Sequence, residues 1–424
     1  MRFLDRQPLA KWLFPALGAL VIGVASIRDH FEADLWWHLA SGRWMWDHLR
    51  ILRLDPFSYT VAGHAWHDHE WLFQVLIYPL YSTFQMHGVL LFKAGLLIVS
   101  ALGFYRALPK TWAPSVKAAV LVAFFGFLRF RNMARADLIS LTLFPWFVSF
   151  YLDLYQQRKP FELRDIRADK RFALHVFLMW VWVNSHGGFL ALWGATGLAA
   201  LAWMAQPSGK GRSLLRNPFV VLLASFGIVS LANPYGYGLL VSTLDWTYQL
   251  LTHNSGDFQE YLPTPYGGYE GFWIGMLLAW AIGLAVQWQR RKWDALGVLW
   301  LAYATWVGHS FIRNIPFSFF LAVPVVCDAL ARVGPAQAAP GAFKRLYDGM
   351  ILAGLLILLG WSVPRMSWGV RENVVPKRCA EFIRGHLDHR RGYNDYNLGG
   401  YLIWSLYDRD NPVFIDGRMH SVEG

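Results

Sequence analysis

Apolar runs recur along almost the whole chain and are separated by short, often basic linkers. A helix that crosses the hydrocarbon core of a bilayer needs about 20 mostly apolar residues, or about 17 at the short end. Twelve runs of 12 to 18 residues approach this length and carry few charged side chains. They predict a polytopic, all-helical membrane protein. The runs cover residues 12–27, 71–84, 88–105, 114–130, 138–152, 172–183, 189–205, 218–232, 272–287, 294–308, 315–331 and 347–363.

The composition supports the same class. Hydrophobic residues make up 55% of the chain and charged residues only 16%, whereas soluble domains carry about 25% charged residues. The net charge of +11 comes from Lys and Arg that cluster in the linkers between the apolar runs. Cytoplasmic loops of membrane proteins have this bias, so we do not expect nucleic acid as a partner.

The basic linkers also predict the topology. If run 71–84 does not cross the membrane, 21 Lys and Arg lie on the inner side and 8 lie in the outer loops before the tail. This run has 14 residues and contains Pro79, which favours an interfacial or re-entrant helix. We therefore expect about eleven transmembrane helices, with juxtamembrane helices in a first outer loop at residues 28–87.

Two regions follow from this topology. Residues 1–363 form the predicted transmembrane domain in a cytoplasmic (inner) membrane, with the N-terminus cytoplasmic. Residues 364–424 and the first outer loop are expected to be extracytoplasmic. The C-terminal segment is predicted as a small α/β unit, with a helix at 376–389 and a short strand at 412–415.

The first outer loop concentrates acidic and histidine residues, and it contains half of the 14 histidines of the chain. A carboxylate near apolar walls has a raised proton affinity unless it is paired, so it can act as a general base or hold a divalent cation. Asp34 is the first choice for the base. The alternative is an acid in the first turn of a helix that stabilises the helix dipole.

A histidine-rich cluster ends this loop. His67, His69 and Glu70 could hold a metal, although they lack a spacing such as H-E-x-x-H, and solvated loop histidines are the alternative. We keep a divalent metal, Mg²⁺ or Mn²⁺, as a prediction, with Asp34, His69 and Glu70 as ligands and no other cofactor.

Three further outer segments carry polar residues. Arg135 could hold a phosphate and Asp137 could complete an acidic site, or the two could pair with each other structurally. His186 lies in an Asn-Ser-His-Gly-Gly sequence at a helix end, where the glycines permit a close approach or simply a tight turn. Arg313 could face a lipid phosphate or extend to the interface. The Asn-Pro-Tyr-Gly sequence at 233–236 is typical of a turn.

Several short motifs together resemble bacterial membrane proteins of the GT-C glycosyltransferase type. The resemblance extends over nearly the whole chain. The motifs are DLWWHL at 34–39, DPFSYT at 55–60, HEWL at 69–72, WVNSHGG at 182–188, NPYG at 233–236, NDYNLGGYL at 394–402 and FIDGR at 414–418.

The resemblance implies an inverting glycosyltransferase with a polyprenyl-phosphate-linked sugar donor. By similarity, the essential acid of the first outer loop falls on Asp34, and a second acid that opens a later helix after an arginine falls on Asp137. Some members need a divalent metal and others do not. This chain departs from many members, because Glu32 and Asp34 are separated by Ala33. The tail is short for a complete outer domain, so we expect a truncated C-terminus.

We therefore expect transfer of a sugar to a glycan, lipid or protein acceptor at the outer face of the membrane, with the lipid bilayer and the lipid-linked donor as partners. The alternatives are a transporter or flippase for a lipid-linked substrate and a non-catalytic scaffold for envelope assembly. The chain shows no internal repeat of the kind common in transporters. The expected catalytic residues are Asp34, Asp137 and Glu70, and the expected substrate- or phosphate-binding residues are His38, Arg135, His186 and Arg313.

Overall fold

The computed structural model describes most of the chain, and the regular structure of the described residues is helical without a strand. The described residues are 7–28, 32–131, 133–157, 169–206, 213–252, 261–264, 269–333, 341–370, 375–387, 389–406 and 411–418.

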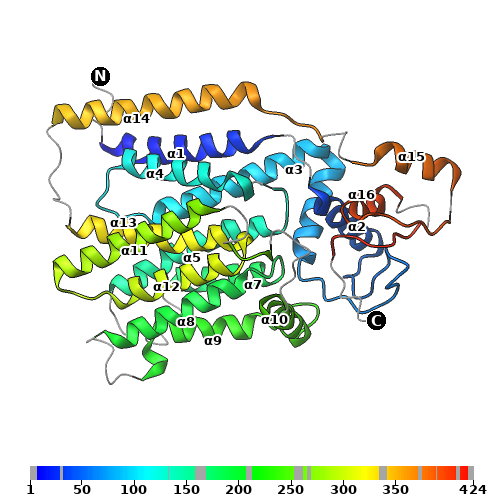
Figure 1. The fold of residues 1–424 in the computed structure, drawn as a ribbon, viewed down its shortest axis with the longest axis horizontal. Helices are drawn as coiled ribbons and strands as arrows, with labels where there is room; N and C mark the ends of the chain where they lie inside the picture. The colour runs from blue at the N-terminus through cyan, green and yellow to red at the C-terminus, as the bar shows by residue number, and fades with distance from the viewer. Residues whose placement is uncertain are drawn as a thin grey trace.

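Each of the twelve apolar runs lies largely in a helix, because long aliphatic and aromatic side chains leave the backbone free to form its own hydrogen bonds. Figure 1 shows these helices side by side in an elongated bundle. They are α1 (Gln7–Ser26), α3 (Trp71–Ala107), α4 (Pro114–Phe127), α5 (Asp137–Gln157), α7 (Lys170–Val183), α8 (Phe189–Ala205), α9 (Pro218–Val229), α11 (Glu270–Arg290), α12 (Ala295–Ser310), α13 (Ile315–Val333) and α14 (Gly341–Ser362).

Several of these helices are long and apolar enough to cross a membrane. Five segments of the described chain meet both criteria: Trp71–Ala107, Asp137–Gln157, Glu270–Arg290, Ile312–Val333 and Phe343–Arg365. Four shorter apolar helices accompany them. A multi-pass membrane protein is therefore supported. The predicted count of eleven spans is not confirmed, and the orientation of the termini stays a prediction.

Helix α3 is broken near its middle. Gln85 has φ 50° and ψ −145°, which no α-helix contains. A side chain at Gly88 would overlap the carbonyl oxygen of Leu80, so the two limbs meet at a sharp bend. Figure 1 shows the limbs at a steep angle to each other. The break falls between the apolar runs 71–84 and 88–105, which the sequence separates. The interfacial position of the first limb stays a prediction.

Aromatic rings tie the bundle together. The rings of Phe104 on α3 and Phe124 on α4 stack at 4.2 Å, and Phe320 on α13 lies 5.3 Å from Phe124. Phe144 on α5 lies 6.2 Å from Phe320. Inside a bilayer, close van der Waals packing of this kind holds helices together, because burial from water contributes little there.

A second group of helices lies at one end of the bundle, where Figure 1 places α2, α10, α15 and α16. The first loop contains a helix, α2 (Ala33–His48), and its predicted juxtamembrane position stays a prediction. Between the apolar runs 218–232 and 272–287, the structure has a helix that the sequence analysis missed, α10 (Tyr237–Thr252).

The described part of the tail forms two helices, α15 (Lys377–His386) and α16 (Tyr396–Leu406). The predicted strand at 412–415 is not observed among the described residues. It is replaced by a single parallel bridge between Ser58 and Val413. The expected α/β tail is therefore not confirmed.

Candidate active site

One cavity of about 490 Å³ lies at the end of the bundle where α2 and α10 meet the loops that follow α4, α7 and α12. All eight predicted site residues line it, although they come from five separate segments of the sequence. The structure thus brings these residues together, while their chemical roles stay predictions. The eight are Asp34, His38, His69, Glu70, Arg135, Asp137, His186 and Arg313.

An aspartate and an arginine form the polar end of the cavity. Asp34 lies in the first turn of α2, where the helix dipole favours an acid. Its Oδ2 atom lies 2.6 Å from Nη2 of Arg135, and its Oδ1 atom accepts a hydrogen bond of 3.2 Å from Trp37. Asp34 is therefore an acid in the first turn of a helix, as the alternative interpretation expected, and it also lines the cavity. Its role as a base stays a prediction.

The same arginine also approaches Glu32, whose Oε1 atom lies 3.7 Å from the Nε atom of Arg135. Burial raises the pKa of Glu32 to about 8, and the charge of Arg135 opposes this shift. Glu32 is therefore mostly protonated at pH 7. Arg135 acts as the counter-charge of Asp34 rather than as one cation shared equally by two anions.

Asp137 has a different partner from the one suggested by the sequence. Its carboxylate pairs with Arg131, not with Arg135, and each side chain of the pair is only 7% exposed. The 3₁₀ turn η1 (Leu128–Arg131) ends close to the first turn of α5, which places Arg131 beside Asp137. The described partner of Asp137 is therefore Arg131, while Arg135 lies against Asp34 and Glu32. The Oδ1 atom of Asp137 is buried and has no hydrogen-bond partner among the described residues.

Glu70 lies between two histidines. Its carboxyl oxygens are 3.9 Å from Nε2 of His38 and 3.8 Å from Nε2 of His69. Burial raises the pKa of Glu70 well above its usual range, and the nearby Asp68 adds to this shift. Burial also lowers the pKa of His69 to about 4 and that of His38 well below its usual range. The cluster is therefore a set of buried groups whose neutral forms are favoured.

His186 is held by a hydrogen-bond chain that fixes its tautomer. The Trp182 indole N–H donates to Ser140 Oγ at 2.6 Å, which leaves the Ser140 proton for Nδ1 of His186 at 2.7 Å. The backbone N–H of Gly188 donates to the same Nδ1 atom at 3.0 Å. Because Nδ1 accepts twice, the ring proton lies on Nε2, which faces the cavity. Burial lowers the pKa of His186, so the imidazole is neutral.

Arg313 meets this histidine across the cavity. Its Nη2 atom lies 3.3 Å from Nε2 of His186, and its Nη1 atom donates to the hydroxyl of Tyr261. The guanidinium also lies 4.7 Å from the centre of the Tyr261 ring. A guanidinium N–H can only donate, so this contact is a hydrogen bond in the tautomer in which Nε2 accepts. With the ring proton on Nε2, both groups present N–H donors, and an anion between them would accept from both.

The remaining wall of the cavity comes mainly from α10 and α12 and is mixed in character. Leu250, Leu251, Trp306 and Val307 supply apolar side chains, and α10 also supplies the polar side chains of Thr243, Asp245 and Gln249. Away from the cavity, α10 exposes a stripe of large apolar side chains at helical spacing. The stripe consists of Tyr237, Val241, Leu244 and Tyr248. The cavity thus joins a charged end to an end that carries both polar and apolar side chains.

The predicted metal ligands Asp34, His69 and Glu70 all line the cavity. Among the described residues, no three His, Cys, Asp or Glu side chains are close enough to hold an ion. Asp34 is paired with Arg135. A metal beside Asp34 therefore stays a prediction.

Three of the cavity residues to which sequence reasoning gave no role lie beside the predicted site residues. Tyr261 holds Arg313, and Gly417 and Arg418 of the tail complete the wall beside Asp34. The FIDGR motif at 414–418 was the only signal for the last two, and nothing in it indicated contact with the first loop.

Comparison with known proteins gives a likeness in fold. No protein-family model matches the sequence, and the search of curated proteins gives no match either. Among solved structures, the fold is similar to that of the Archaeoglobus fulgidus oligosaccharyltransferase in its apo form, with a TM-score of 0.59 and 12% sequence identity. The match covers 98% of this chain and 65% of that protein.

This likeness defines the class of fold. The chain shares the helical architecture of an oligosaccharyltransferase, and the predicted GT-C type of fold is confirmed at that level. The chain spans about two-thirds of the length of that protein, and 12% identity carries no residue roles across. The bacterial subgroup and the dependence on a polyprenyl donor stay predictions.

Proposed function

We propose that this chain is a membrane glycosyltransferase that moves a sugar from a polyprenyl-phosphate-linked donor to an acceptor at the outer face of the cytoplasmic membrane. The observation that carries the proposal is the cavity itself. Within about 490 Å³ it brings together a carboxylate paired with an arginine, the N–H groups of Arg313 and His186, and apolar side chains of α10 and α12. Transfer from a lipid-linked sugar phosphate needs a base for the acceptor, donors for the phosphate and an apolar surface for the lipid chain.

The phosphate is proposed to bind between Arg313 and His186. Both side chains line the cavity and carry N–H groups, and a developing phosphate charge in the leaving group would be stabilised by donors that are already in place. The polyprenyl chain is proposed to follow the apolar side chains of Leu250, Leu251, Trp306 and Val307. The sugar would then lie toward Asp34.

Asp34 is proposed as the base that takes the proton from an acceptor hydroxyl or amine. Arg135 holds the carboxylate in place at 2.6 Å and keeps it aimed into the cavity. Glu70, with its raised pKa, is proposed to receive or return a proton at the same end. The acceptor would be a glycan, a lipid or a protein, and Asp137 is retained as a second acid of the site.

The test is thermal melting of the detergent-solubilised protein with polyprenyl phosphate, with polyprenol of the same chain length as the reference. A ligand at 100 times its Kd that binds only the folded state adds about 2.7 kcal/mol. We expect polyprenyl phosphate to raise Tm by several degrees and polyprenol to raise it much less. The variant Arg313→Gln should lose most of the phosphate-dependent shift. Arg43→Gln, on the surface of α2 and outside the cavity, should keep it.

The same assay examines the predicted metal. An additional shift from Mn²⁺ or Mg²⁺ that is lost in Asp34→Asn would place an ion beside that residue. If no polyprenyl lipid shifts Tm at all, the lipid-donor proposal fails, and a transporter or an assembly scaffold becomes the better interpretation.

A further inference from the structure

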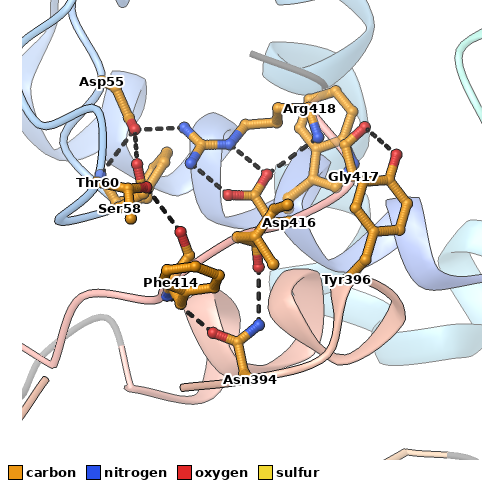
Figure 2. Close-up of polar contacts among 12 residues, drawn as sticks. Asp55, Ser58, Thr60, Asn394, Tyr396, Phe414, Asp416, Gly417 and Arg418 are labelled. Atoms are coloured by element: carbon orange, nitrogen blue, oxygen red, sulfur yellow. Dashed lines mark hydrogen bonds and ion pairs between the residues drawn. The ribbon is translucent and has the colours of Figure 1, made fainter. Parts of the chain in front are cut away.

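The last described segment of the tail, residues 411–418, runs beside the first outer loop. The backbone N–H of Tyr59 donates to the carbonyl of Val413 at 3.1 Å, and the N–H of Val413 donates to the carbonyl of Phe57 at 3.0 Å. The Thr60 hydroxyl adds a third bond to the tail, at 2.7 Å, as Figure 2 shows. Two segments more than 350 residues apart are thus joined by backbone pairing.

The buried side chain of Arg418 links the tail to the first loop by ion pairs. Its Nη1 atom lies 2.5 Å from Oδ1 of Asp55, and its Nε and Nη2 atoms bind both oxygens of Asp416 at 2.7 and 2.6 Å (Figure 2). The guanidinium lies 4.9 Å from the Phe57 ring centre and 5.0 Å from that of Trp66. The side chain is fully enclosed. Without Arg418, the carboxylates of Asp55 and Asp416 would be buried charges with no counter-charge. Breaking these ion pairs therefore costs free energy of folding.

The residue before this arginine touches the proposed base. A side chain at Gly417 would overlap Oδ1 of Asp34 and would lie 3.3 Å from Nε1 of Trp37. Gly417 does not have a positive φ, so the glycine is needed for space rather than for its backbone conformation. Its carbonyl accepts a bond of 3.3 Å from Tyr396 at the start of α16 (Figure 2).

Helix α16 also packs against the first turns of α2. A side chain at Gly400 would come within 2.6 Å of the carbonyl oxygen of Ala33, one residue before Asp34. The ring of Tyr401 packs edge-on against Trp36 at 4.9 Å. The tail therefore packs closely against the first turn of α2. Gly400 and Gly417 allow the close approach, and the ring contact of Tyr401 with Trp36 adds to it.

We propose that the tail is a wall of the active site, that Arg418 is its positioning residue, and that Gly417 keeps open the space in which the acceptor meets Asp34. Arg418 acts through Asp55 and Asp416: it fixes the segment 416–418 on the first loop, and this places Gly417 against the carboxylate. The acceptor part of this inference rests on the proposed function. The placement of Asp34 by the tail does not.

The test uses the full chain in detergent and two measurements that need no substrate. The first is hydrogen–deuterium exchange of peptides that cover residues 57–60 and 411–418. The second is labelling of Asp34 by a water-soluble carbodiimide and a small amine, measured by peptide mass spectrometry. Arg391→Gln is the matched control, because Arg391 is exposed on the same tail and lies 5.5 Å over the Tyr59 ring without lining the cavity.

Arg418→Gln should lose protection of both peptides, and labelling of Asp34 should rise at least fivefold, because the wall no longer covers the carboxylate. Arg418→Lys keeps a charge but cannot bind both carboxylates in the same planar fork, so we expect an intermediate rise. This second variant keeps the test informative if the first one does not fold. Arg391→Gln should stay within twofold of the wild type in both measurements.

Gly417→Ala separates positioning from folding. This variant keeps the ion pairs of Arg418 with Asp55 and Asp416. Protection of residues 411–418 from hydrogen exchange should therefore stay within twofold of the wild type. Labelling of Asp34 should fall at least threefold, because the new methyl group fills the space beside the carboxylate that the glycine leaves open. Wild-type labelling of Asp34 in Gly417→Ala and in both Arg418 variants would overturn the inference. Absence of any polyprenyl phosphate shift in the wild type would overturn only the proposed function.

Discussion

The Asp34 carboxylate lies 2.6 Å from the guanidinium of Arg135, although one residue begins α2 and the other precedes α5. This contact joins the first outer loop to the second and sets one end of the cavity. The two arginines of the second loop both line the cavity but have different partners: Arg135 pairs with Asp34, and Arg131 pairs with Asp137.

Replacing Asp34 by Asn should abolish turnover while the protein stays folded. The amide keeps the shape of the side chain but cannot take a proton, and loss of a general base costs about 10²- to 10⁴-fold in rate. Turnover would be followed as sugar transfer in membranes that contain the native donor. Asp47→Asn, on the same helix and more exposed, is the control and should keep its rate. Full activity of Asp34→Asn would remove this residue from the mechanism.

Replacing Gly188 by Ala should break the chain of hydrogen bonds that orients His186. The added methyl group would come within 2.6 Å of Ser140 Oγ and 2.9 Å of Nδ1 of His186. Overpacking of this kind costs about 1–3 kcal/mol, and the Nε2 proton would no longer face Arg313. We expect a lower Tm and at least a tenfold weaker response to polyprenyl phosphate. Gly197→Ala on the same helix meets no atom within 4 Å and should leave both unchanged.

Replacing Asp137 by Asn should destabilise the protein, because it leaves Arg131 as a buried cation without its counter-charge. Breaking a buried ion pair on one side costs about 3–5 kcal/mol. The double variant Arg131→Gln with Asp137→Asn removes both charges and should lose less stability than Asp137→Asn alone. Thermal melting of the three variants measures the difference. A single variant that melts like the wild type but loses turnover would favour the catalytic role predicted from the sequence.

Asp68 predicts a pH dependence of stability. Its carboxylate accepts bonds from Gln74 and the backbone of Glu70, and burial raises its pKa to about 7. The folded protein therefore holds this proton more tightly than the unfolded chain, whose aspartates titrate near 3.9. The contribution is full below about pH 4 and is lost as pH rises through 7.

The measurement is the difference in Tm between the wild type and Asp68→Asn, taken from pH 4.5 to pH 8. The wild type should lose stability relative to the variant over this range, by at most about 4 kcal/mol from the size of the pKa shift. A constant difference across the range would show that Asp68 does not titrate in this window.

Part of the architecture followed from the sequence because it depends on local patterns. Apolar runs become helices wherever the backbone must satisfy its own hydrogen bonds, and the break in α3 falls between two runs that the sequence already separates. The gathering of Asp34, Glu70, Arg135 and His186 in one cavity was also anticipated, because all four lie in segments that the charge distribution placed on one side of the membrane.

Other features depend on contacts between distant segments and were not predictable. The sequence left open whether Asp137 pairs with Arg135, two residues away, and the end of η1 brings Arg131 to Asp137. Tyr261 and α10 fall between two apolar runs, where no helix was expected, and their place on the cavity depends on contacts with distant residues such as Arg313.

The sequence by itself determined the class of protein, a helical membrane protein with polar residues concentrated in its outer loops, because hydrophobicity and charge act residue by residue along the chain. The tertiary structure alone decided which charges meet. The contact of Gly417 with Asp34 and the enclosure of Arg418 between Asp55 and Asp416 exist only because the tail lies on the first loop. Ion pairs and close approaches depend on distances in space, and no local pattern specifies those distances between segments that are far apart in the chain.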